Sequence, residues 1–151
     1  MAKKSRDDSS FIGRHSLTIV VLIVLLSWTL LYSVSDQSTH WGSFFGNAVA
    51  DWSGVLVVVL ATKRMYEKGS AESHEPPHPI LRPVPKILRD HSLTIFLVIT
   101  GAGWVALFAH LRPEAKWGEV VGNIVSEWTQ IIGLVLLTKK LREVHSKESK
   151  R

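Results

Sequence analysis

The sequence contains no cysteine, and four of its stretches contain no charged residue. Without cysteine the chain has no disulfide framework, no thiolate nucleophile and no cysteine-ligated metal. A soluble domain mixes charged and apolar residues at the period of a helix or a strand, and the uncharged stretches do not. The mean hydropathy of +0.15 and the net charge of +5 therefore average over apolar spans and basic segments between them. The uncharged stretches are residues 17–32, 55–62, 93–109 and 131–138.

Motifs that hold cofactors or perform covalent catalysis are also missing. The sequence has no Gly-rich phosphate loop and no nucleophile elbow, and its seven histidines lack the spacing of zinc ligands. Basic pairs such as Lys139-Lys140 are the ordinary flanks of a membrane span and do not indicate nucleic-acid binding. We therefore expect no enzyme, no cofactor, no metal and no nucleic-acid partner.

The sequence repeats itself, without a gap, at an offset of 76 residues. Between His15 and Glu67, 19 of 53 positions are identical to the residues of segment 91–143. The six tryptophans form three matched pairs, 28 with 104, 41 with 117 and 52 with 128. Fixed-period similarity of this kind indicates an internal duplication.

Each repeat predicts two membrane-spanning helices. The first, of about 18 residues, is about 27 Å long, close to the ~30 Å hydrocarbon core of a bilayer. Only helices or closed barrels satisfy the backbone in lipid, and these stretches lack the alternation of a barrel. The predicted fold is an all-α membrane protein with four transmembrane helices, built as two tandem helical hairpins. The predicted spans are residues 16–33, 42–62, 92–110 and 118–138.

Two spans per repeat give both repeats the same orientation in the membrane. The expected relation is a parallel pseudo-two-fold repeat with its axis along the membrane normal, which argues against an alternating-access transporter built from inverted repeats. Of the 18 Lys and Arg residues, 16 lie outside the two short loops at 34–40 and 111–116. The positive-inside rule then places both termini and the linker in the cytoplasm.

The chain is thus divided into two membrane units and three cytoplasmic segments. A cleaved signal peptide at the basic N-terminus is the alternative, and the recurrence of the same segment at residue 91 argues against it. The linker contains five of the six prolines and is expected to be an extended connector. The predicted segments are the N-terminus 1–15, the first unit 16–67, the linker 68–90, the second unit 91–143 and the basic tail 144–151.

The second helix of each repeat contains an asparagine and an acid four residues apart, which places them on one helix face. They are Asn47 with Asp51, and Asn123 with Glu127. Each acid lies about 15 Å deep, near the bilayer centre, where an ionised carboxylate almost always faces protein or water. One interpretation is a shared cation or proton site. The alternatives are a protonated acid that bonds a neighbouring helix, for example at Ser27 or Thr100, or a shallower position.

Other polar and small residues allow two interpretations each. His15 and His91, at the cytoplasmic helix ends, suit a proton relay or a residue that precedes a serine N-cap. Trp52 and Trp128 either line a pore or fill space between helices. Gly46 and Gly122 follow small-xxx-small spacings, Gly42 to Gly46 and Gly118 to Gly122, that permit close helix approach.

The stretch from Asn47 to Ser73, ending in Lys-Gly-Ser-Ala-Glu-Ser, resembles a family of bacterial four-span membrane proteins known only as a domain of unknown function. That family also has two tandem units, an Asn-Trp-x-Ser-Glu-Phe pattern and a Lys/Arg-Gly-Ser-x-Glu-Ser signature. The resemblance matches Asn47 and Asn123 to the family Asn, and Asp51 and Glu127 to its Glu. This chain departs from it by lacking Trp after Asn, by short outer loops, and by a degraded second signature at residues 146–149.

The resemblance implies a bacterial inner membrane and no particular activity. We expect a multi-pass membrane protein with a cation or proton site at Asp51 and Glu127. The alternative is a non-catalytic accessory, assembly or scaffold subunit of a larger membrane complex. The expected partners are anionic lipid headgroups at the cytoplasmic face, together with a homo-oligomer or a larger complex.

Overall fold

The computed structural model describes residues 11–73, 77–112 and 115–141, with side chains from residue 15 onward. Within these residues every regular element is helical. Four long helices follow in order, with a 3₁₀ turn and a short helix between the second and third. The long helices are α1 (Phe11–Val34), α2 (His40–Ala61), α4 (Ser92–His110) and α5 (Lys116–Leu137); the short elements are η1 (Pro79–Leu81) and α3 (Lys86–Asp90).

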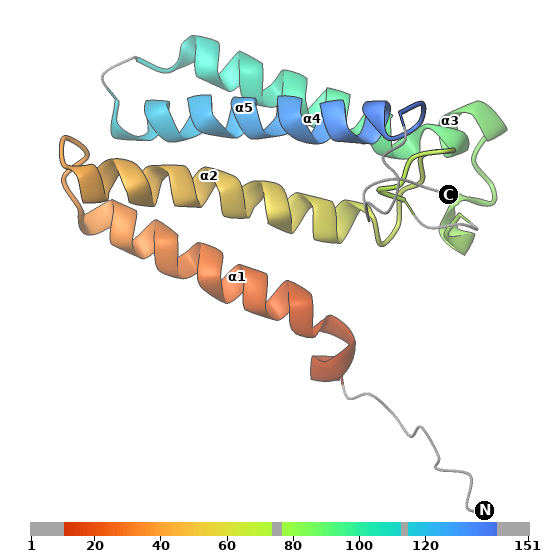
Figure 1. Cartoon of the computed structure of the whole chain (residues 1–151), viewed down its shortest axis with the longest axis horizontal. Coiled ribbons are helices and arrows are strands. Elements are labelled where there is room, and N and C mark those ends of the chain that lie inside the picture. The colour runs from red at the N-terminus through yellow and green to blue at the C-terminus, as the bar shows by residue number, and fades with distance from the viewer. Residues whose placement is uncertain (1–10, 74–76, 113–114, 142–151) are drawn as a thin grey trace, which may run out of the picture.

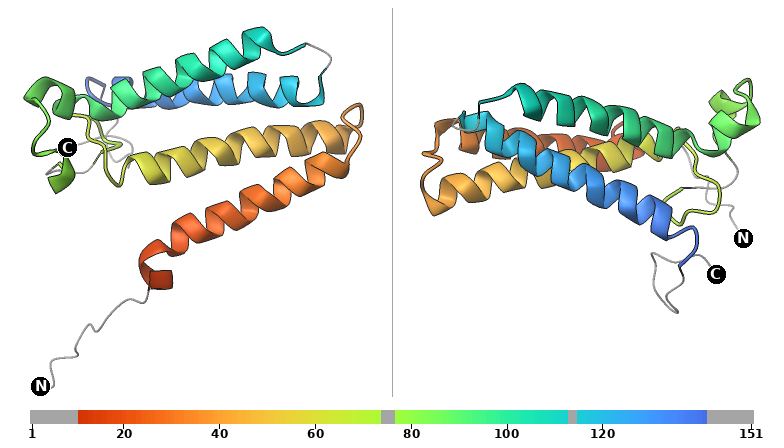
Figure 2. Two further views of the ribbon diagram at one scale, coloured as in Figure 1. Left: turned by 180° about the vertical axis from the view of Figure 1, so that it is seen from behind. Right: turned by 90° about the horizontal axis from the view of Figure 1, so that it is seen from above.

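The helices form two antiparallel hairpins that meet through their second members (Figures 1 and 2). α1 packs on α2, α4 packs on α5, and α2 packs on α5. α2 and α5 run in the same direction and form the central pair, while α1 and α4 lie outside it (Figure 1). The end of the bundle with the linker also holds the C-terminal ends of α2 and α5.

Four helices are long and apolar enough to cross a membrane, as the uncharged stretches predict. Three of them begin and end within two residues of the predicted spans. α1 begins at Phe11, five residues before the predicted start, so His15 and Ser16 lie inside the helix. The outer surfaces are apolar: Leu30 on α1 is 68% exposed and Ile99 on α4 is 66% exposed. Such surfaces suit lipid rather than water.

The two hairpins are closed by the same contact. The ring of Tyr32 on α1 lies on Gly46 of α2, and the ring of Phe108 on α4 lies on Gly122 of α5. These residues are related by the 76-residue offset, as are the bounds of α2 and α5 at both ends. A methyl group at Gly46 or Gly122 would approach the ring to 3.0 or 2.9 Å, which is tighter than ordinary packing. Glycine therefore sets the spacing within each hairpin.

The linker is more ordered than the extended connector expected from its prolines. It contains η1 and α3, and residues 66–73 fold back onto the ends of α4 and α5. Gly69 adopts a positive φ of 86°, which allows the chain to reverse there. Hydrogen bonds of this segment to distant helix ends, rather than local helix or strand structure, hold it in place.

Candidate functional site

The four polar residues singled out from the sequence meet where α2 contacts α5. Asp51 and Glu127 are each eleven residues from the start of their helix, at His40 and Lys116. At 1.5 Å per residue this is about 16 Å, the middle of each span. Because α2 and α5 run side by side in the same direction, the two acids lie at the same level.

The side chains at this level contact one another across the two helices. The Asn123 amide donates a hydrogen bond to the amide oxygen of Asn47. The carboxyl group of Glu127 lies close enough to Asp51 for the two acids to interact electrostatically. A Cβ atom on Gly54 would be 3.1 Å from Oε2 of Glu127, so this glycine gives the acid room to lie against α2. The structure thus brings together one amide and one acid from each repeat. These four residues, Asn47, Asp51, Asn123 and Glu127, form a polar seam between α2 and α5.

One side of the seam is open. Asn47 and Asp51 are exposed, while Asn123 and Glu127 are half-buried. On α5 the open surface continues with Ser126 and Gln130, and the Gln130 amide lies 3.3 Å from Oε1 of Glu127. Polar side chains at mid-span are costly against lipid, so they need protein or water beside them.

Neither residue named as an alternative partner for the acids contacts them through a hydrogen bond that the structure records. The Ser27 hydroxyl donates to the carbonyl of Ile23 within α1. The Thr100 hydroxyl accepts a 2.9 Å hydrogen bond from Nε1 of Trp128. Among the described residues, the two acids interact electrostatically with each other across α2 and α5 instead.

The matched tryptophans differ in their surroundings. Trp128 is buried, 3% exposed, and packs edge-to-face on Trp104 with ring centroids 5.7 Å apart. It therefore fills space between α4 and α5 rather than lining an opening. Trp52 is only half-buried on α2.

A second polar cluster, at the linker end of the bundle, is built around Glu67. This carboxylate is fully buried, accepts a hydrogen bond from the ammonium group of Lys139, and lies 2.8 Å from Nδ1 of His91. Its other oxygen accepts a 3.2 Å bond from the backbone N–H of Thr94, in the first turn of α4. A carboxylate in this position also interacts favourably with the helix dipole. The Glu67 cluster thus joins the end of α2 to α4 and α5.

The charge of Glu67 is stabilised despite its burial. Burial raises the pKa of this carboxyl group, but the hydrogen bonds from Lys139, His91 and Thr94 outweigh it and hold the pKa below its ordinary value. The following segment is fixed in the same way, because the Ser70 hydroxyl lies 3.0 Å from the hydroxyl of Thr138 at the end of α5. The Lys-Gly-Ser-Ala-Glu-Ser stretch therefore connects the segment that follows α2 to the end of α5 in the other repeat.

The structure also places the two histidines. His91 immediately precedes α4 and contacts Glu67, whereas Ser92 bonds the backbone of Tyr66 instead of capping its own helix. His15 is half-buried within α1. Near it, the Lys63 ammonium donates a 2.7 Å hydrogen bond to the hydroxyl of Thr18. At the 76-residue offset these two residues correspond to Lys139 and Thr94, which each bond Glu67.

Glu67 did not emerge as a site residue from the sequence. Two signals point to it: it is identical to its counterpart at position 143 of the second repeat, and it directly precedes the Lys-Gly-Ser-Ala-Glu-Ser stretch. Its importance depends on contacts with residues 24 and 72 positions away, which no local pattern reveals.

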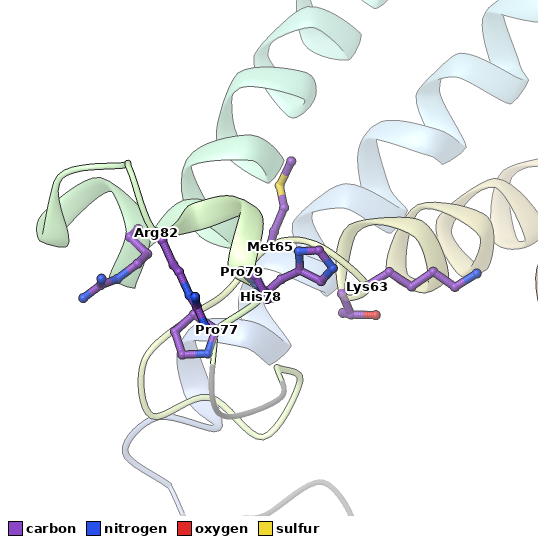
Figure 3. A pocket seen from close by; sticks show the side chains of 8 residues that line it. Lys63, Met65, Pro77, His78, Pro79 and Arg82 are labelled. Carbon is purple, nitrogen blue, oxygen red and sulfur yellow. The ribbon is translucent and has the colours of Figure 1, made fainter.

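A basic hollow of about 520 Å³ lies where the linker meets the end of α2 (Figure 3). Its floor includes Met65 and prolines. The Lys63 side chain points away from His78 (Figure 3) and reaches Thr18, so the cations do not converge on one point. The lining residues are Thr62, Lys63, Met65, Pro77, His78, Pro79, Arg82 and Arg89.

Comparisons with protein families, curated proteins and solved structures find no match to the chain. Among the described residues, no three His, Asp or Glu side chains gather as metal ligands. The seam and the Glu67 cluster are therefore the candidate functional sites of the described residues.

Proposed function

We propose that this chain is a multi-pass protein of a bacterial cytoplasmic membrane in which the seam forms a cation or proton site. The observation that carries the proposal is the meeting of Asp51 and Glu127 at mid-span, with Asn47 and Asn123 beside them. Carboxylate and amide oxygens suit hard cations, and two close carboxyl groups suit a shared proton. In this proposal the seam binds and passes ions, and the role is not enzymatic.

The proposed orientation places both termini and the Glu67 cluster in the cytoplasm. The basic hollow supports this orientation, since anionic headgroups of the inner leaflet attract Lys and Arg near the membrane surface. His91, in contact with Glu67 at the same end, is a candidate for passing protons between the cytoplasm and the span, with His15 as its repeat counterpart.

The test is flux through the purified protein in liposomes. We expect the wild-type chain to pass protons or monovalent cations, and the Asp51→Asn/Glu127→Gln variant to lose this flux. The matched control is Glu119→Gln, which removes an exposed acid from the first turn of the same helix α5. Loss of flux in the control as well would show that charge, rather than the seam, is responsible.

The second candidate is an accessory or scaffold subunit of a larger membrane complex. The open side of the seam favours it, because a partner helix would cover the polar residues there. Absence of flux in the wild-type chain, together with stable co-purification of a complex whose binding is lost in the Asp51→Asn variant, would establish this function instead.

A further inference from the structure

The contact between α2 and α5 joins two different faces of equivalent helices. Gly54 of α2 lies against Ile131 of α5, since a Cβ atom on the glycine would be 3.3 Å from Cδ1 of Ile131. At the 76-residue offset, however, residue 54 corresponds to Gln130, and Ile131 corresponds to Val55. The repeats therefore associate head-to-tail, through non-equivalent faces. The face of α2 that contains Gly54 lies on the face of α5 that contains Ile131, the counterpart of Val55.

This arrangement leaves one face of each kind without a helix on it. On α5, Gln130 and the neighbouring Ser126 are exposed. On α2, Val55 is 43% exposed. A head-to-tail contact of this type generates a ring where the rotation between neighbours closes, and an open filament where it does not.

The geometry of the helix sets the size of the ring. Consecutive residues are about 100° apart around an α-helix, so the residue-54 and residue-55 faces meet at nearly a right angle. Four helices that contact their neighbours at right angles close a square. Since each chain supplies two such helices, α2 and α5, two chains complete it.

We propose that a second copy of this chain docks on the open faces, so that Gln130 of each copy meets Val55 of the other. The two contacts are related by a two-fold axis, and no face of this kind remains open. Ser126 and Gln130 are larger than their counterparts Ala50 and Gly54, so the helices are further apart between copies than within one.

The second copy completes the seam. Around α2, Asp51 lies about 60° from Gly54 and about 40° from Val55, which places it between the two contact faces. It therefore points into the ring, as does its counterpart Glu127 on α5. The exposed Asn47 and Asp51 then face other protein or enclosed water instead of lipid, as intramembrane polar residues require. The inference rests on the proposed membrane-spanning site and adds the partner that encloses it.

The test uses the absence of cysteine, which makes every introduced thiol unique. Two differently tagged single variants, Val55→Cys and Gln130→Cys, are co-expressed and oxidised in native membranes. We expect a disulfide-linked mixed dimer, and little linked product when either variant is expressed alone. The matched control is the pair Leu26→Cys and Ile99→Cys, on exposed faces of α1 and α4, which should stay unlinked.

Three results would overturn the inference: no link above the control, efficient linking of Val55→Cys to itself, or a ladder beyond dimers in the double variant. If the cysteine variants fail to fold, the mass of the wild-type protein in nanodiscs decides, since twice 16.9 kDa is expected and a single chain contradicts it. A linked dimer without ion flux would refute the proposed function alone. Flux from single chains would refute the dimer alone.

Discussion

Two glycines, Gly46 and Gly122, set the distance between the helices of the two hairpins. At each position an aromatic ring occupies the space into which a methyl group would project. Tyr32 is also held by a hydrogen bond from its hydroxyl to the carbonyl oxygen of Lys116, so its ring has less freedom to move than that of Phe108. Gly46 and Gly122 thus have a steric role that Gly103 and Gly133 of the same spans lack.

We predict that Gly46→Ala lowers the free energy of unfolding by about 1–3 kcal/mol, the usual cost of overpacking. Gly122→Ala should cost less, because the Phe108 ring can shift. The matched controls are Gly103→Ala and Gly133→Ala, whose Cβ atoms would meet nothing within 4 Å. These should be neutral or stabilising by up to about 1 kcal/mol through helix propensity. Thermal unfolding in detergent measures all four, and equal effects at all four positions would refute the packing argument.

Glu67 contacts Lys139, His91 and Thr94 at the linker end of the bundle. We predict that Glu67→Gln destabilises the protein by about 2 kcal/mol, because it removes the charge that pairs with Lys139 inside the protein. Lys139→Met should have a similar effect, whereas Lys140→Met, at the exposed neighbouring position, should not. The comparison of the two lysine variants by thermal unfolding separates this contact from a general effect of charge.

At the scale of elements, the helices followed directly from composition, while their contacts did not. The uncharged stretches predicted all four spans because lipid requires apolar side chains over a fixed length. The start of α1 at Phe11 was not predicted, because the uncharged apolar stretch begins several residues after the helix does. Which helix faces pack could not be predicted, since lipid-facing and buried positions are both apolar.

The candidate site was predictable only in part. The four residues of the seam were found because an acid inside an apolar span is rare and has a counterpart in the other repeat. That the two asparagines bond each other, and that one side of the seam is open, depends on helix rotation. The Glu67 cluster joins three elements through residues that are far apart in the sequence, so no local pattern predicts its contacts.

The connection between elements at the linker end should respond to pH. The pKa of Glu67 is lower in the folded protein than in the unfolded chain, so its ionisation favours folding above the ordinary carboxyl pKa. This contribution is lost as the pH falls through the folded-state pKa. We predict that acidification destabilises the wild-type protein more than Glu67→Gln over this range. Parallel unfolding curves against pH for the two proteins would contradict the assignment.

At the scale of the whole molecule, the charge distribution predicts the orientation. Gln37 lies in the short loop between α1 and α2, and Lys68 lies in the linker at the other end of the bundle, and both are exposed. We predict that Gln37→Cys in intact cells reacts with a membrane-impermeant maleimide, and that Lys68→Cys reacts only after the cells are broken. The reverse pattern would invert the topology and place the basic hollow outside the cell.

The two hairpins meet through one acid from each, Asp51 and Glu127. If Asp51 and Glu127 act as one site, replacing either acid should abolish as much cation or proton flux as replacing both. The decisive measurement is therefore cation and proton flux in liposomes for Asp51→Asn, Glu127→Gln and the double variant. We predict that each single variant loses nearly as much flux as the double variant. Independent losses that multiply in the double variant, or unchanged flux in all three, would contradict a shared site.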